Sequence, residues 1–140
     1  MKIILVSHGK LAKGMKNTVE MIAGNQDNLE AYEAYKNGTS DDSFIGDIKN
    51  SLDKVGDQKA VIITDVLGGS VNNEMTQLLK DHQNLMVLTG MNLPLVITLV
   101  TTADSGLTQE SIEEAINEGQ KGVLSINKLM TEDDDEGDLL

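Results

Sequence analysis

The sequence predicts an α/β domain: an open, doubly wound and mainly parallel sheet of four strands, with helices on both faces. Three observations predict this fold. The chain has 140 residues, the length of one ordinary domain. Short apolar runs alternate with segments of helical periodicity, as expected for a parallel sheet covered on both faces. No linker or internal repeat divides the chain.

The first half of the chain contains two predicted strand–helix units. Residues 2–6 are mostly apolar and predict a buried strand. One stripe of an amphipathic helix follows, formed by Leu11, Met15, Val19 and Ile22. The next strand, residues 29–35, is interrupted by two glutamates, which favours a position near an edge of the sheet. A second helix is expected over residues 44–55, after several candidate N-caps.

The second half continues this alternation. Apolar runs at residues 60–63 and 85–88 predict the third and fourth strands, with a helix between them. Residues 93–100 predict a well-buried helix, because the run is almost wholly apolar. A last helix is expected from Thr108 to about residue 119. The apolar run at residues 123–126 then predicts an extra C-terminal strand.

Acidic residues gather at the C-terminus. Six of the 23 Asp and Glu residues fall within residues 132–140. Such a run cannot build an apolar core, because its charges are more stable in water. The sequence therefore predicts a folded domain over residues 1–131 and an acidic, disordered tail over residues 132–140.

Composition excludes several classes of function. The formal net charge is −12, so direct binding to nucleic-acid phosphates is not expected. The longest mainly apolar stretch, residues 93–100, is far shorter than the roughly 20 residues of a membrane-spanning helix. Without cysteine, the chain has no disulfide and no thiolate metal site. The N-terminal apolar run is too short for a secretory signal, so we expect a cytoplasmic protein without direct membrane insertion.

Polar residues follow the predicted strands where the chain leaves the sheet. His8 closes the first strand, and Asp65 follows the third strand. The sequence Gly68-Gly69-Ser70 then leads into a helix. Ligands of open α/β sheets bind beyond the carboxyl ends of the strands. We therefore expect His8, Asp65 and Ser70 to lie on one rim of the sheet if the first, third and fourth strands are neighbours.

Their chemistry is that of a phosphoryl site. An imidazole can be a general base, a metal ligand or a nucleophile. A carboxylate such as Asp65 fixes the ring's tautomer and leaves one nitrogen free to attack. Two glycines before a helix let backbone N–H groups approach an anion, and Ser70 can either cap that helix or bind a phosphoryl oxygen. All eleven basic residues are lysines, so no arginine is present to clamp a phosphate.

These motifs resemble one family. Val6-Ser7-His8-Gly9 after the first strand, together with Ile63-Thr64-Asp65-x-x-Gly68-Gly69-Ser70 after the third, is similar to the mannose-class IIA domain of the bacterial phosphoenolpyruvate-dependent sugar phosphotransferase system. The resemblance implies that His8 is phosphorylated on Nε2 and that Asp65 orients its ring through Nδ1. It also implies that Ser70 and nearby amides hold the phosphoryl group. Val71 stands where members of the family often have proline.

The resemblance also implies partners. The phosphocarrier protein HPr would donate the phosphoryl group, and a IIB component would accept it and phosphorylate a sugar with the IIC and IID membrane components. No cofactor and no metal are expected. The family's homodimer exchanges a terminal strand, a role that residues 123–126 could take.

Other readings remain open at this stage. The chain is a candidate phosphocarrier subunit of dihydroxyacetone kinase, or a regulatory domain without catalysis. A small metal chelatase would use His8 as a ligand, but the other histidine, His82, falls near a helix end far from Asp65. A phosphohistidine phosphatase is disfavoured, since such enzymes surround phosphate with arginines.

Overall fold

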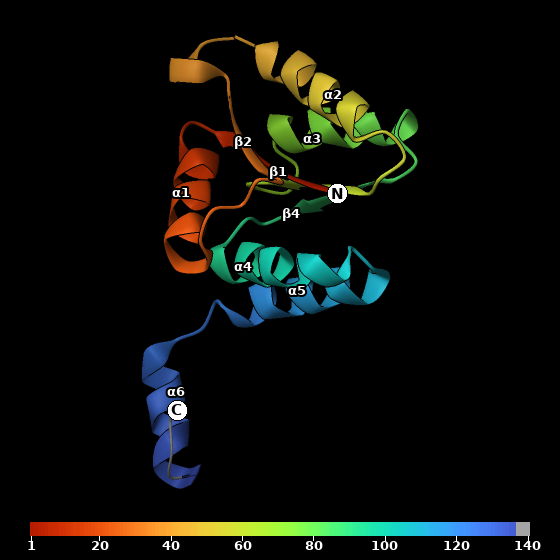
Figure 1. The fold of residues 1–140 in the computed structure, drawn as a ribbon. Helices are drawn as coiled ribbons and strands as arrows, with labels where there is room; N and C mark the ends of the chain where they lie inside the picture. Colours follow the sequence, from red (N-terminus) through yellow and green to blue (C-terminus); the bar gives the residue numbers. More distant parts are fainter. Residues whose placement is uncertain (137–140) are drawn as a thin grey trace.

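The computed structural model describes residues 1–136 as a four-stranded parallel sheet between two helical layers (Figure 1). The strands are β1 (Lys2–His8), β2 (Leu29–Ala34), β3 (Ala60–Thr64) and β4 (Leu85–Thr89). They lie in the order β2-β1-β3-β4, and every neighbouring pair is parallel. The predicted fold class is confirmed.

Six α-helices connect or follow the strands. Their bounds are α1 (Leu11–Ala23), α2 (Ser43–Val55), α3 (Ser70–Gln77), α4 (Leu93–Thr102), α5 (Gln109–Lys121) and α6 (Ile126–Glu136). A short 3₁₀ turn, Leu78–Lys80, extends α3. Helices α2 and α3 lie over one face of the sheet, and α4 and α5 lie over the other (Figure 1).

Alternation within the central strands explains both layers. In β1, Ile3 and Leu5 pack with α1, α4 and α5, whereas Ile4 and Val6 pack with α2 and α3. All four side chains are fully buried. A strand buried on both faces must be apolar at consecutive positions, which is the pattern that the sequence shows.

Edge position explains the polar character of β2. Glu30 on this strand accepts hydrogen bonds from Lys2, Tyr32 and Ser51. Burial acts to raise the pKa of Glu30, but these donors outweigh it and the pKa is lowered. The two glutamates that interrupt this run are therefore compatible with a strand at the edge of the sheet, as the sequence predicts.

The C-terminal segment differs from its prediction. Residues 123–126 do not form a strand: Ile126 begins α6, and the preceding residues are irregular and exposed. Ser125 explains the difference, because its side chain accepts a hydrogen bond from the N–H of Lys128 and its carbonyl accepts one from Leu129. A serine in that place starts a helix.

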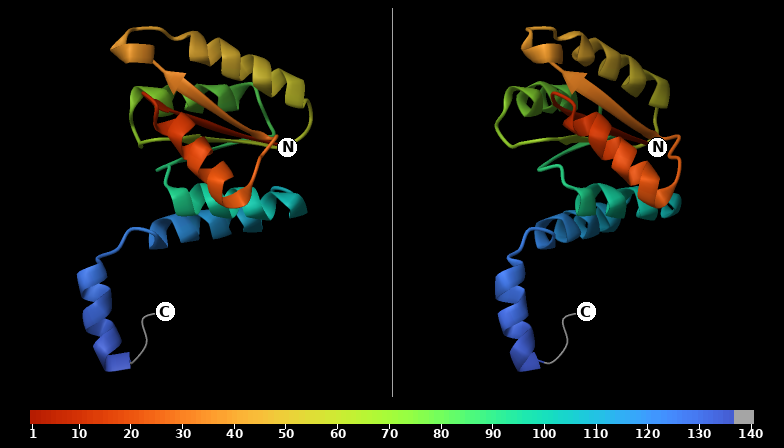
Figure 2. Two further views of the ribbon diagram at one scale, coloured as in Figure 1. Left: turned by 60° about the vertical axis from the view of Figure 1, so that its left-hand side comes forward. Right: turned by 90° about the vertical axis from the view of Figure 1, so that its left-hand side faces the viewer.

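Helix α6 projects away from the body of the domain (Figure 2). It continues through the acidic residues 132–136, and residues 137–140 of the predicted disordered tail lie outside the described residues. The division into a folded domain and an acidic tail stays a prediction. None of the helices in the described part of the chain is long and apolar enough to cross a bilayer.

Candidate functional site

The site lies where the strand order reverses. From β1 the chain crosses to β2 on one side, and from β3 it crosses to β4 on the other. Val6 of β1 is opposite Thr64 of β3, so the two strands leave the sheet almost level with each other. Their carboxyl ends form the crevice in which open α/β sheets bind ligands.

His8 is the last residue of β1. The turn behind it needs a glycine, because Gly9 has a φ of +57°. The hydroxyl of the buried Ser7 holds this turn by accepting a 2.8 Å hydrogen bond from the N–H of Ala12, in the first turn of α1. The imidazole is thus presented at the surface from a rigid base, with 48% of its side chain exposed.

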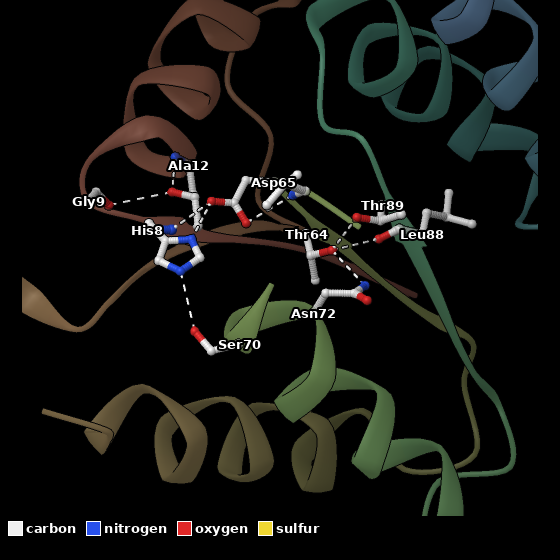
Figure 3. A network of polar contacts seen from close by, with 11 residues as sticks. His8, Gly9, Ala12, Thr64, Asp65, Ser70, Asn72, Leu88 and Thr89 are labelled. Atoms are coloured by element: carbon white, nitrogen blue, oxygen red, sulfur yellow. Dashed lines mark hydrogen bonds and ion pairs between the residues drawn. The ribbon is translucent and has the colours of Figure 1, made fainter. Parts of the chain in front are cut away.

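Asp65 fixes the orientation of that imidazole (Figure 3). Its Oδ2 accepts hydrogen bonds from the ring Nδ1 of His8 at 2.8 Å and from the backbone N–H of His8 at 2.9 Å. Its Oδ1 accepts the N–H of Val66. An ionised carboxylate can only accept, so Nδ1 carries the proton and the neutral ring keeps its lone pair on Nε2.

The same contacts keep Asp65 ionised. Its side chain is only 12% exposed. Burial acts to raise the pKa of Asp65, but the hydrogen bonds from the ring and the backbone of His8 outweigh burial, and the pKa is lowered below its ordinary value. At neutral pH the site therefore contains a carboxylate that holds a proton on Nδ1.

The loop after β3 lies on the other side of the ring. The Oγ of Ser70 is 3.4 Å from Nε2 of His8, at the long end of hydrogen-bond distances (Figure 3). Gly69 lies beside the ring: a Cβ there would be in ordinary contact with Cε1 of His8, at 3.5 Å, and in tight contact with Cγ1 of Val66, at 3.2 Å. Gly68 has a φ of +78°, a conformation that a side chain would strain.

Helix α3 points its first turn toward this place. Gly69 is its N-cap, and within the described residues no side chain caps it. The first backbone N–H groups of a helix have no partner inside the helix, and they carry the positive end of its dipole. Nε2 of His8 therefore lies near the hydroxyl of Ser70, the first residue of this helix, an arrangement suited to an anion carried on that nitrogen.

The five residues singled out in the sequence are thus placed together. His8 and Asp65 are hydrogen-bonded, Gly69 and Ser70 border the ring, and Gly68 lies one residue behind them. Of the two roles open to Ser70, the structure makes it the first residue of α3 with its hydroxyl toward the ring, so it is not the cap.

Two neighbours of the site were not singled out. Tyr35 adopts a left-handed conformation after β2, and its ring lies 6.0 Å from the His8 ring, centroid to centroid. Asn72 is buried beneath the loop and contacts Gly68 and Thr64. The only sequence signal for Asn72 is that an asparagine stands on the apolar face of a predicted helix. No sequence signal points to Tyr35.

His82 lies at the opposite end of the sheet, just before β4. Its Nδ1 donates to the carbonyl of Leu78 at 2.9 Å, as expected for a histidine after a helical segment. Among the residues whose side chains the structure describes, no three His, Asp or Glu side chains are grouped as they would be to hold a metal ion.

The family model described as "PTS system fructose IIA component" (EIIA-man) matches residues 2–116. The chain belongs to this family of phosphotransferase system (PTS) IIA components. It is a sugar phosphotransferase system IIA domain of the mannose type, and by family a phosphotransferase domain.

Several relatives agree with this assignment. The chain is 27% identical to the PTS system mannose-specific EIIAB component of Escherichia coli, over 89% of this chain and 39% of that one. It thus spans about two-fifths of that relative's length. It is also 27% identical to the PTS system sorbose-specific EIIA component of Lacticaseibacillus casei, over 99% of both chains.

A solved structure gives the same result. The PTS IIA protein associated with the fucose utilization operon of Streptococcus pneumoniae superimposes with a TM-score of 0.80 at 27% identity. The match covers 92% of this chain and 95% of that one. The family and the fold are therefore shared, whereas the sugars named for these relatives differ.

Proposed function

We propose that this IIA domain carries a phosphoryl group on Nε2 of His8, accepting it from phosphorylated HPr and donating it to a IIB component. One observation carries the proposal. Oδ2 of Asp65 lies 2.8 Å from Nδ1 of His8 and keeps the proton on that nitrogen. The lone pair of Nε2 is therefore free, on the side of the ring where Ser70 begins α3. The role assigned to each of these residues is part of the proposal.

The transfer step is a nucleophilic displacement at phosphorus. The Nε2 lone pair of His8 attacks the phosphorus of the donor phosphohistidine, and the donor's nitrogen–phosphorus bond breaks with its electron pair returning to the donor ring. The proton on Nδ1 stays in place, and Asp65 stabilises the positive charge that the ring acquires. Donation to the IIB component is the same step in the other direction, with His8 as the leaving group.

The phosphoryl oxygens need donors that are not arginines. The hydroxyl of Ser70 and the N–H groups at the start of α3 lie on the Nε2 side of the ring and can supply them. Gly69 leaves bare backbone next to the ring, where a Cβ would otherwise contact Cε1 of His8 at 3.5 Å. These donors are pre-oriented by the loop, so they bind the group without a rearrangement.

The partners and setting follow from the same proposal. The chain acts in the cytoplasm, between HPr and a IIB component, and serves the IIC and IID membrane components only indirectly. It forms a homodimer through its C-terminal segment. Large apolar side chains exposed on that segment support this association: Val123, Leu124, Ile126 and Met130. The strand exchange expected from the sequence is not part of the proposal, because this segment forms no strand.

The test is labelling with phosphoenolpyruvate in the presence of enzyme I and HPr. We expect one acid-labile phosphoryl group per chain, lost in His8→Gln and retained in the matched control His82→Gln. Thermal unfolding of both variants should match the wild type. Labelling of His8→Gln, or an unlabelled wild-type chain, would contradict the proposal. The charged protein is then offered to a IIB component or to dihydroxyacetone kinase, and transfer only to the kinase would replace the sugar pathway.

A further inference from the structure

A buried chain of polar contacts lies beneath the loop that borders His8 (Figure 3). The backbone N–H of Gly68 donates to Oδ1 of Asn72 at 3.4 Å, and Nδ2 of Asn72 donates to Oγ1 of Thr64 at 3.0 Å. The hydroxyl of Thr64 is 2.8 Å from that of Thr89. Thr64 is fully buried and Asn72 nearly so. The chain links the ends of β3 and β4 to the loop.

The direction of these hydrogen bonds is determined by one group. A backbone N–H can only donate, so the atom of Asn72 that faces Gly68 must be the oxygen, and Nδ2 must face Thr64. The hydroxyl of Thr64 then accepts from Asn72 and donates onward to Thr89. Asn72 must accept with its oxygen and donate with its nitrogen, so a carboxylate or an apolar side chain at residue 72 cannot reproduce the pattern.

The loop has few other anchors. Between Asp65 and Gly68 its side chains point outward: Val66 is 53% exposed and Leu67 is 77% exposed. Neither side chain packs into the core, so the hydrophobic effect that stabilises most of the domain contributes little to the position of this loop. The loop is fixed at its start by Asp65 and at Gly68 by Asn72, which itself lies in the first turn of α3.

We infer that Asn72 is a positioning residue for phosphoryl transfer: it fastens Gly68 to the end of β3 and thereby sets Gly69, Ser70 and the first N–H groups of α3 relative to Nε2 of His8. This inference rests on the proposed function. Asn72 touches neither the ring nor the phosphoryl group, and it acts through the loop. Without it, the donors on the Nε2 side move relative to the ring, and a displacement of about 1 Å can slow a reaction roughly 100-fold.

The test compares Asn72→Ala with Asn73→Ala. Asn73 is the next residue of the same helix, and its side chain is exposed, so it controls for helix propensity. We expect Asn72→Ala to slow labelling by HPr at least about tenfold, and Asn73→Ala to leave the rate unchanged. Thr64→Val and Thr64→Ser form a second pair: valine removes the hydroxyl and should slow labelling, whereas serine should restore it.

Nuclear magnetic resonance separates positioning from general damage. In the wild type, phosphorylation should shift the amide signals of Ser70 and Val71 strongly, because their N–H groups bind the phosphoryl oxygens. These shifts should shrink in Asn72→Ala, while the Nδ1–H signal of His8 stays, since the contact with Asp65 does not involve Asn72.

Each outcome decides between the two claims. A wild-type chain that cannot be labelled overturns both the proposed function and this inference. The second outcome is that the wild type is labelled, and that Asn72→Ala folds, is labelled at the same rate and shows the same shifts of the Ser70 and Val71 amide signals. That outcome supports the proposed function and overturns the role of Asn72. If Asn72→Ala does not fold, the Thr64 pair decides: equal rates for valine and serine overturn the inference.

Discussion

The two histidines of the chain lie at opposite ends of one helical segment, α3 with its 3₁₀ extension. His8 faces the start of α3, and His82 follows its end, bonded to the carbonyl of Leu78. In both rings Nδ1 donates to an oxygen, so both rings are held at that nitrogen. A hydrogen bond from Nδ1 therefore does not by itself distinguish the proposed phosphoryl site from His82.

What differs is the surroundings of Nε2. Near His8 they are a hydroxyl and the positive end of a helix dipole. Near His82 they are the carboxylate of Asp53, 3.8 Å away, at the negative end of the same helical segment. A phosphoryl dianion is attracted to the first place and repelled from the second. In the proposed function, the helix end and the orienting acid are the two features that favour His8 over His82.

Removal of the orienting acid should have the largest effect on this comparison. In Asp65→Asn, the amide can present its nitrogen to Nδ1, which moves the proton to Nε2 and removes the nucleophile. We expect labelling to slow by roughly 10²- to 10⁴-fold with the fold retained. The matched control is Asp53→Asn, which alters the exposed carboxylate beside His82 and should leave the rate unchanged. Equal rates for Asp65→Asn and the wild type would exclude Asp65 from the mechanism.

Loss of the hydroxyl should have a smaller effect. Ser70→Ala removes one of several donors on the Nε2 side and leaves the N–H groups of α3 in place. We expect about a tenfold slower transfer, the equivalent of roughly 1.4 kcal/mol, without loss of stability since Ser70 does not cap the helix. Stopped-flow transfer from phosphorylated HPr measures it. If Ser70→Ala transferred as fast as the wild type, the hydroxyl would have no role and backbone N–H groups would be the only donors to the phosphoryl oxygens.

The smallest expected effect is on stability in acid. The pKa of Asp65 is lower in the folded chain than its ordinary value of 3.8, so its contribution to folding is complete above that value and is lost as the pH falls through and below it. Urea unfolding at about pH 7 and pH 3 should show the stability of wild type and Asp65→Asn converging at the lower pH. If the two proteins differed by the same free energy of unfolding at both pH values, the charge of Asp65 would not contribute to stability.

Much of this site could be predicted from the sequence, for a physical reason. Strands buried on both faces are continuous apolar runs, so their ends are visible, and the ends of parallel strands meet at one rim. His8 and Asp65 stand at the ends of such runs, and Ser70 follows Asp65 after a short loop. Their juxtaposition therefore follows from the order of the strands, which the alternation of strands and helices restricts.

Other features could not be predicted because they depend on contacts distant in sequence. The two roles of the Asn72 amide are defined only once Gly68 and Thr64 are placed around it. The buried face of α1 is shorter than the apolar stripe in its sequence: Val19 is buried, but Leu11 and Ile22 at the two ends of the stripe are exposed. Residues 123–126 show the limit of short apolar runs, which do not distinguish a strand from the start of a helix.

For the proposed phosphoryl transfer, the absence of arginine from the sequence has a consequence for the discharged protein. A guanidinium clamp would leave uncompensated positive charge when its anion departs, and the surrounding chain would have to adjust. Hydroxyl and amide donors carry no net charge, and water can take the place of the phosphoryl oxygens. The loaded and empty forms should therefore share one backbone conformation, so that a partner can distinguish them only by the cargo itself.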